Sequence, residues 1–119
     1  LLSDFLQLDY GRTLAACADR HDLVAVRLIA ADLHDPPAAM LRVADPEDGG
    51  RRVVDLADKR VRAAWLARAA LLRERMRSRM REARVDVLEL PIPRRPDIRA
   101  LAAPVQRFFH ARELREIYR

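Results

Sequence analysis

The stretch LVAVRLI at residues 23–29 decides the fold. It is a nearly continuous run of aliphatic, partly β-branched residues, which is typical of a buried strand in a parallel sheet. Another apolar run at residues 1–6 predicts a second strand. Turn residues at 9–11 and apolar positions at helical spacing over 12–20 predict a short helix between the two strands. Strand, helix and strand within about 30 residues form a βαβ unit, which is right-handed in nearly all proteins.

The rest of the chain continues this alternation. Residues 30–39 contain Pro36 and Pro37 and are expected to form a loop. Two short strands at 40–44 and 51–55 flank the segment DPEDGG, a hairpin signal with glycine available for positive φ. A strand is expected at 85–90, followed by a stiff loop with prolines at 91, 93 and 96.

Two helices complete the predicted order. The longer one spans about 59–83, with Asp58 as its N-cap. Its apolar positions fall in one stripe, made of Val61, Trp65, Ala69, Leu72, Met76, Met80 and Ala83. The second spans about 97–117 and is expected to restart at Pro104. Its inner face should consist of Val105, Phe108, Phe109 and Leu114.

This order predicts an α/β fold, namely half of a doubly wound, mostly parallel sheet with an inserted β-hairpin. The chain begins inside an apolar run without an initiating Met, so we expect residues 1–119 to be a single partial domain whose N-terminal strands are missing. An apolar strand that has lost its neighbour exposes a sheet edge, and self-association through that edge is expected.

The charge pattern offers one alternative function. The chain carries a net charge of +5, and the segment 58–84 has ten basic side chains against three acidic ones. Such a helix could follow a phosphate backbone as a nucleic-acid-binding module. However, arginines at 73, 75, 77, 79 and 81 recur every second residue and therefore ring the helix. We expect a solvated outer helix and no specific binding of nucleic acid.

The residues that carry chemistry are sparse. The serines lack a nucleophile-elbow context, and the three glycines form no phosphate-binding loop. The histidines lie in separate elements, and the cluster around His34 lacks converging zinc ligands. We therefore predict a non-enzymatic protein. Cys17 is expected to be a small buried apolar residue, and a single cysteine favours a reducing, cytoplasmic location. No apolar stretch approaches the ~20 residues that span a bilayer, so no membrane contact is expected from this segment.

Asp4 is the one candidate ligand. It follows the first predicted strand, and ligands of doubly wound sheets bind outside the carboxyl ends of the strands. A carboxylate at that place can hold a hard cation, although an Asp that only starts a turn has the same sequence pattern.

The ordered set of motifs resembles the MoxR-associated von Willebrand factor A-like family of uncharacterised bacterial proteins. The matching segments are LSDF at 2–5, RHDLVAVR at 20–27, LRVADPEDG at 41–49, VDVL at 85–88 and FFHAR at 108–112. The family usually has Asp-Pro and Leu-Pro-Gly in the loop before the hairpin, and the segment DLHDPPAA at 32–39 departs from that pattern.

This resemblance implies a C-terminal half of a von Willebrand A-like domain, in which Asp4 is one residue of a metal-ion-dependent adhesion site. The resemblance further implies Mg²⁺ in the full-length domain, with the remaining ligands outside this fragment, and a protein partner of the MoxR-type AAA+ ATPase class. We therefore expect a protein-interaction or adaptor domain with metal-assisted partner binding.

Overall fold

The computed structural model describes residues 1–5, 10–45, 48–95 and 97–118. Three strands form a parallel sheet in the order β1 (Leu2–Ser3), β2 (Val24–Ala30) and β5 (Asp86–Ile92). All three strands run parallel, and each new strand along the chain is added on the same side of the one before it. This succession is consistent with half of an α/β domain, as the sequence predicts.

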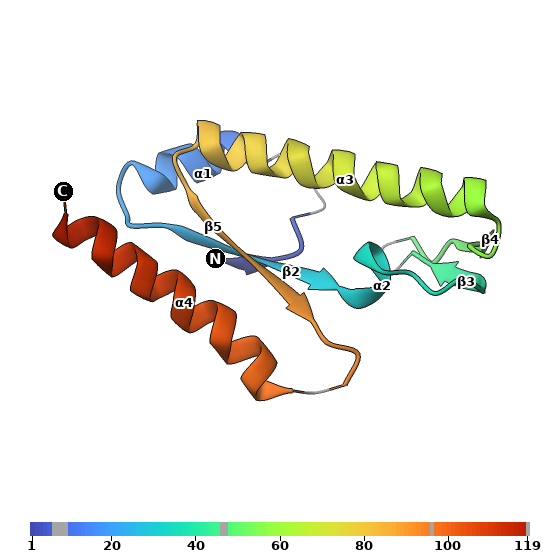
Figure 1. Cartoon of the computed structure of the whole chain (residues 1–119). Helices are drawn as coiled ribbons and strands as arrows, with labels where there is room; N and C mark the ends of the chain where they lie inside the picture. The colour runs from blue at the N-terminus through green and yellow to red at the C-terminus, as the bar shows by residue number, and fades with distance from the viewer. Residues whose placement is uncertain (6–9, 46–47, 96, 119) are drawn as a thin grey trace.

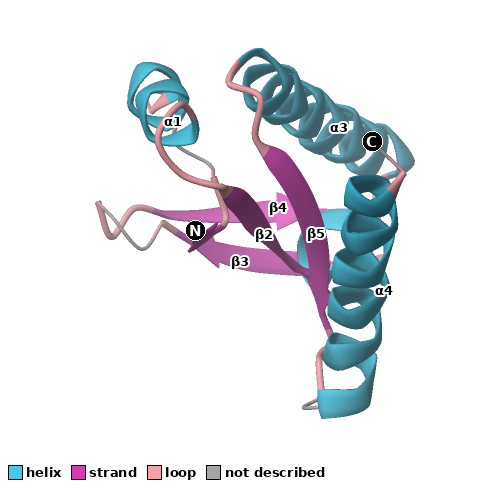
Figure 2. Cartoon of the chain, turned by 90° about the vertical axis from the view of Figure 1, so that its left-hand side faces the viewer, coloured by secondary structure: helices cyan, strands magenta, loops and turns pink. Residues whose placement is uncertain are grey.

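Helices cover both faces of this sheet (Figures 1 and 2). α1 (Gly11–Ala18) and α3 (Lys59–Glu82) lie on one face, and α4 (Ile98–Ile117) lies on the other. Arg112 ties α4 to the amino-terminal end of the sheet, because its Nε is 2.9 Å from a carboxylate oxygen of Asp86 and its Nη2 donates to Asp22.

The hairpin forms a separate two-stranded sheet. β3 (Met40–Ala44) pairs antiparallel with β4 (Arg51–Asp55), as the DPEDGG segment predicts, and Gly49 adopts a φ of 71° in the turn region. The hairpin lies under the amino-terminal part of α3, beyond the end of the parallel sheet (Figure 1). The long helix therefore bridges the two sheets.

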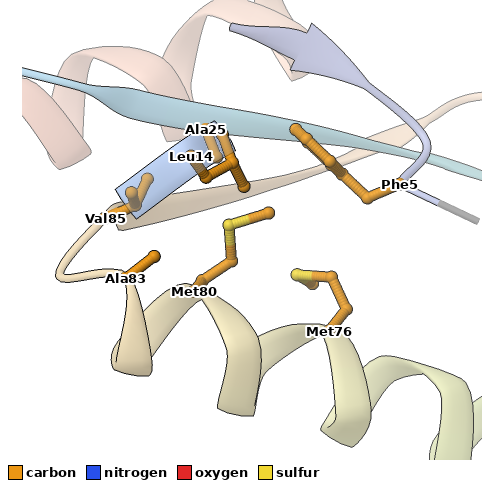
Figure 3. Packing of buried hydrophobic residues seen from close by; sticks show 7 residues of the cluster. All are labelled: Phe5, Leu14, Ala25, Met76, Met80, Ala83 and Val85. Carbon is orange, nitrogen blue, oxygen red and sulfur yellow. The ribbon is translucent and has the colours of Figure 1, made fainter. Parts of the chain in front are cut away.

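The hydrophobic core lies between the parallel sheet and the carboxyl-terminal half of α3 (Figure 3). Met76 and Met80 are 1% and 0% exposed, and they point from α3 toward Ala25 of β2 and Leu14 of α1. The stripe on α3 is confirmed there. Toward the helix start the same stripe is half-buried at Trp65 and exposed at Val61, because only the hairpin and α2 (Ala31–His34) lie beneath.

Three predictions from local sequence rules are wrong. Residues 30–39 are not only a loop, since the four-residue helix α2 forms before Pro36 and Pro37. Pro91 lies inside β5 and not in the loop after it. This is tolerated because β5 is an edge of the described sheet, where every second N–H points away from the neighbouring strand. Finally, α4 runs through Pro104 without restarting.

Two burial predictions also fail. Cys17 is exposed, because α1 turns Leu14 toward the core and has Ala15 and Ala18 packed beside it. The inner face predicted for α4 is only half-buried at Val105 and Phe108, and Phe109 and Leu114 are more than 40% exposed. None of the residues of α4, all of which the structure describes, is buried.

The first strand is shorter than predicted. It covers only Leu2–Ser3, and Phe5 adopts a φ of 54°, which ends the extended backbone. Part of the predicted strand and of the turn after it, residues 6–9, lies outside the described residues. The predicted short helix is present as α1, and it begins directly after Tyr10.

Candidate functional site

A pinned turn places Asp4 at the carboxyl end of β1. The next residue, Phe5, is held in the left-handed region, which is strained for an aromatic residue. Ser3 Oγ accepts a hydrogen bond from the Phe5 amide at 3.2 Å, and the Tyr10 hydroxyl donates to the Phe5 carbonyl at 3.3 Å. The Phe5 ring is buried and meets Tyr10 edge-on at 5.5 Å. These contacts fix the turn and leave Asp4 exposed.

Asp4 borders a broad open cavity of about 960 Å³ between the parallel sheet and the hairpin. Ser3 and Asp4 line it from the end of β1, and Leu33 lines it from α2, directly after the end of β2. The carboxyl ends of two parallel strands therefore meet at this cavity, which is the usual ligand position in a doubly wound sheet.

The lining of the cavity is more acidic than basic. The hairpin contributes Asp45, Asp48 and Arg52, and Asp48 accepts a hydrogen bond from the Gly50 amide at 2.6 Å. α3 contributes Trp65, whose indole N–H is buried without a hydrogen-bond partner in the described part of the chain. Burial raises the pKa of the Tyr10 phenol at the cavity wall, although Arg79 and Arg27 lower it. The phenol is therefore a neutral donor at physiological pH.

The described residues do not by themselves fit a metal ion. Over residues 1–5, 10–45, 48–95 and 97–118, no group of three or more His, Cys, Asp or Glu side chains converges as a metal site would require. Mg²⁺ is often bound through one or two carboxylates with several waters, so Asp4 could supply only part of a coordination shell. The assignment of Asp4 as a metal ligand stays a prediction.

A buried charge cluster lies between β2, β5 and α3, and it touches the turn that holds Asp4, because Arg27 Nε donates to the Asp4 carbonyl at 3.5 Å. The sequence pattern did not predict it. Arg27 of β2 and Glu89 of β5 are direct partners in the parallel register, and Arg27 Nη1 is 3.1 Å from Glu89 Oε1. Arg73 of α3 donates from Nε at 2.9 Å and also from Nη2, and Arg77 donates from Nη2 at 2.7 Å. Glu89 thus binds three arginines from two elements.

Electrostatics in this cluster keep Glu89 ionised. Burial alone would raise the pKa of its carboxyl group, but the hydrogen bonds from Arg73 and Arg77 outweigh burial and lower that pKa to about 2. The side chains of Arg27 and Glu89 are only 10% and 12% exposed. The one signal in the sequence was a charged residue in the middle of each of two largely apolar strands, Arg27 in one and Glu89 in the other, but their pairing depends on the register.

The arginines of α3 are partly engaged within the chain. Besides Arg73 and Arg77, Arg81 pairs with Glu74 at 2.9 Å, and Arg62 lies 3.8 Å from Asp35. Arg68 and Arg75 are exposed and make no ion pair with the described residues. The helix is therefore not a uniform row of free cations.

The remaining candidate residues do not converge. His110 is exposed and lies 3.7 Å from Glu113 on the same helix. Asp32, in the segment that resembled a weak zinc cluster, forms an ion pair with Arg94 at 2.8 Å. In the part of the chain that the structure describes, no helix is long and apolar enough to cross a membrane.

Comparison with known proteins adds one match. The model of the family of proteins of unknown function DUF58 matches residues 1–75, which include β1, the βαβ unit, the hairpin and more than half of α3. No curated protein and no solved structure gives a significant match.

Proposed function

Because the chain belongs to the DUF58 family, we propose that it is an interaction module that works with a MoxR-type AAA+ ATPase and binds a protein partner at the cavity beside Asp4. The family is associated with MoxR-type ATPases, which supports this class of partner. The proposal includes no catalytic step, and it assigns the protein to the cytoplasm, where such ATPases act.

The observation that carries the proposal is the meeting of two strand ends at one open cavity. Loops held at the end of a rigid sheet are common binding positions, and here the turn after β1 is pinned by Ser3 and Tyr10. The parallel order β1-β2-β5, with α1 and α3 on one face and α4 on the other, supports a von Willebrand A-like half-domain as the finer assignment.

The acidic lining bears on how a partner would bind. Asp4, Asp45 and Asp48 would repel a partner's carboxylate, so an acidic partner group needs a cation between them. We propose that Mg²⁺ fills this role in the longer protein that the resemblance implies, where further ligands would join Asp4. A partner that presents a basic group would bind without the cation.

The test is a pull-down of the purified MoxR-type ATPase from the same organism by the complete protein. Asp4→Asn should lower the captured ATPase about ten-fold, since a charged contact at an interface is lost. Asp19→Asn, an exposed carboxylate outside the cavity lining, should capture as much ATPase as the wild type. Chelation of Mg²⁺ should weaken capture by the wild type and leave Asp4→Asn unchanged.

A further variant tests whether the basic helix α3, and not the cavity, is the interface with the ATPase. Arg68→Gln with Arg75→Gln removes two exposed cations of α3 that have no ion-pair partner among the described residues. We expect this double variant to capture the ATPase normally. Loss of capture in the double variant alone would make the basic helix the interface and refute the role of the cavity.

A further inference from the structure

The face of the sheet that meets α3 is apolar at one end, charged in the middle and hollow at the other end. Ala25, Arg27 and Ile29 alternate along β2 and therefore point to the same side, and all three are buried. At Ala25 the space under α3 is filled by Met76 and Met80 (Figure 3). Two residues further along β2, the space between the sheet and α3 is occupied by Arg27 and its partner Glu89.

Beyond that cluster, at Ile29, the interface is hollow. A pocket of about 190 Å³ lies between β2, α2 and α3. Its apolar lining residues are Ile29, Leu33, Leu66, Ala69 and Ala70. The hollow exists because α3 presents two alanines here, where the other half of the helix presents two methionines.

One wall of this hollow is cationic. Arg27 and Arg73 line it directly, and both are members of the cluster in which one carboxylate faces three guanidinium groups. The single charge of Glu89 leaves an excess of positive charge beside the hollow. At the other end, Asp32 of α2 and Asp35 directly after this helix are already paired, since Asp32 binds Arg94 and Asp35 lies near Arg62.

We propose that this hollow binds a small carboxylic acid with a short apolar tail. Its carboxylate would lie against the guanidinium groups of Arg27 and Arg73, whose planar forks match carboxylate geometry. Its tail would lie against Ile29, Leu66 and the two alanines. The apolar lining disfavours a phosphate, which would lose the hydration of two charges without polar partners on those walls. This hollow has its own lining, although Arg27 Nε also donates to the Asp4 carbonyl at 3.5 Å and Leu33 borders both the hollow and the cavity beside Asp4. The proposal uses no side chain of Asp4 and does not depend on the proposed function.

The test uses ligand-observed saturation-transfer NMR with pentanoate as the probe on the whole chain. We expect saturation that is strongest at the terminal methyl group of pentanoate, together with binding at least ten-fold weaker for the neutral isostere pentanamide and for acetate. Equal binding of pentanamide would show that the cations play no part, and equal binding of acetate would show that the apolar hollow plays none. Either result, or no binding of pentanoate, overturns the proposal.

Three variants place the ligand. Ala70→Leu fills the hollow with a residue that favours helix, and it should abolish saturation of pentanoate while the circular dichroism of the protein stays unchanged. Arg73→Gln should weaken binding about ten-fold, because a charge-assisted hydrogen bond is lost. Arg75→Gln, an exposed control on the same helix, should bind pentanoate like the wild type. Binding that survives Ala70→Leu and Arg73→Gln would place the acid elsewhere.

Discussion

Glu89 is the residue on which the largest electrostatic effect in this protein depends. It joins β2, β5 and α3 through hydrogen bonds to Arg27, Arg73 and Arg77. Its pKa of about 2 in the folded protein lies below its ordinary value of 4.5, so the ionised form stabilises the fold. This contribution is complete above about pH 4.5 and is lost as the pH falls toward 2.

Replacing Glu89 should therefore change how stability depends on pH. We expect Glu89→Gln to lower the free energy of unfolding at pH 7 by about 2 kcal/mol, after allowance for solvent around Arg73 and Arg77. Between pH 4.5 and 2, the wild type should lose this advantage over the variant. Urea unfolding at a fixed low protein concentration measures both effects.

Glu74→Gln is the control, because it removes an exposed pair with Arg81 and should change the free energy of unfolding little. If the stability of Glu89→Gln depended on pH in parallel with that of the wild type, the role of the cluster would be refuted.

The sequence predicted the contacts of some single residues and not those of others. Asp58 caps α3 as expected, because its Oδ1 accepts from the Arg60 and Val61 amides and such caps depend only on local sequence. Asp4 was placed correctly at a strand end for the same reason. The pairing of Arg27 with Glu89 could not be predicted, since the residues are 62 positions apart and meet only through the strand register.

At the scale of elements, α3 shows what a periodic pattern can and cannot predict. Its apolar stripe and both ends were correctly predicted, because helical period and capping are local properties. The stripe did not tell which part of the helix has a sheet beneath it. Local rules also failed at α2, at Pro91 and at Pro104, where position in the sheet or the tertiary fold decided the outcome.

The uneven burial of the stripe on α3 gives a direct prediction. Met80→Ala should lower the free energy of unfolding by about 3 kcal/mol, because Met80 is fully buried in the core and its loss leaves a cavity. Val61→Ala, on the same stripe but 37% exposed, should cost less than about 1 kcal/mol. Urea unfolding compares the two variants. Equal losses would mean that the amino-terminal half of α3 is packed as tightly as the other half.

At the scale of the whole molecule, the chain is unusually open. Its radius of gyration is 16.8 Å, whereas a compact domain of this length has about 13.5 Å. Its accessible surface is 9437 Å², against roughly 6,600 Å² for a compact monomer of the same mass. α4 has no buried residue, and Ile98, Ile117 and Tyr118 are more than 70% exposed. Beside the cavity at the strand ends, this excess of surface is a second observation that supports the packing of another polypeptide against the chain.

The oligomeric state of the isolated chain tests this central claim most directly. Leu1 and Leu2, at the open edge of the described sheet, are about 60% exposed and offer one route to pairing. Multi-angle light scattering over a range of concentrations should give a mass above 13.7 kDa that rises with concentration, together with a broad thermal transition. A monodisperse monomer of 13.7 kDa with a sharp, cooperative melt at every concentration would contradict the account.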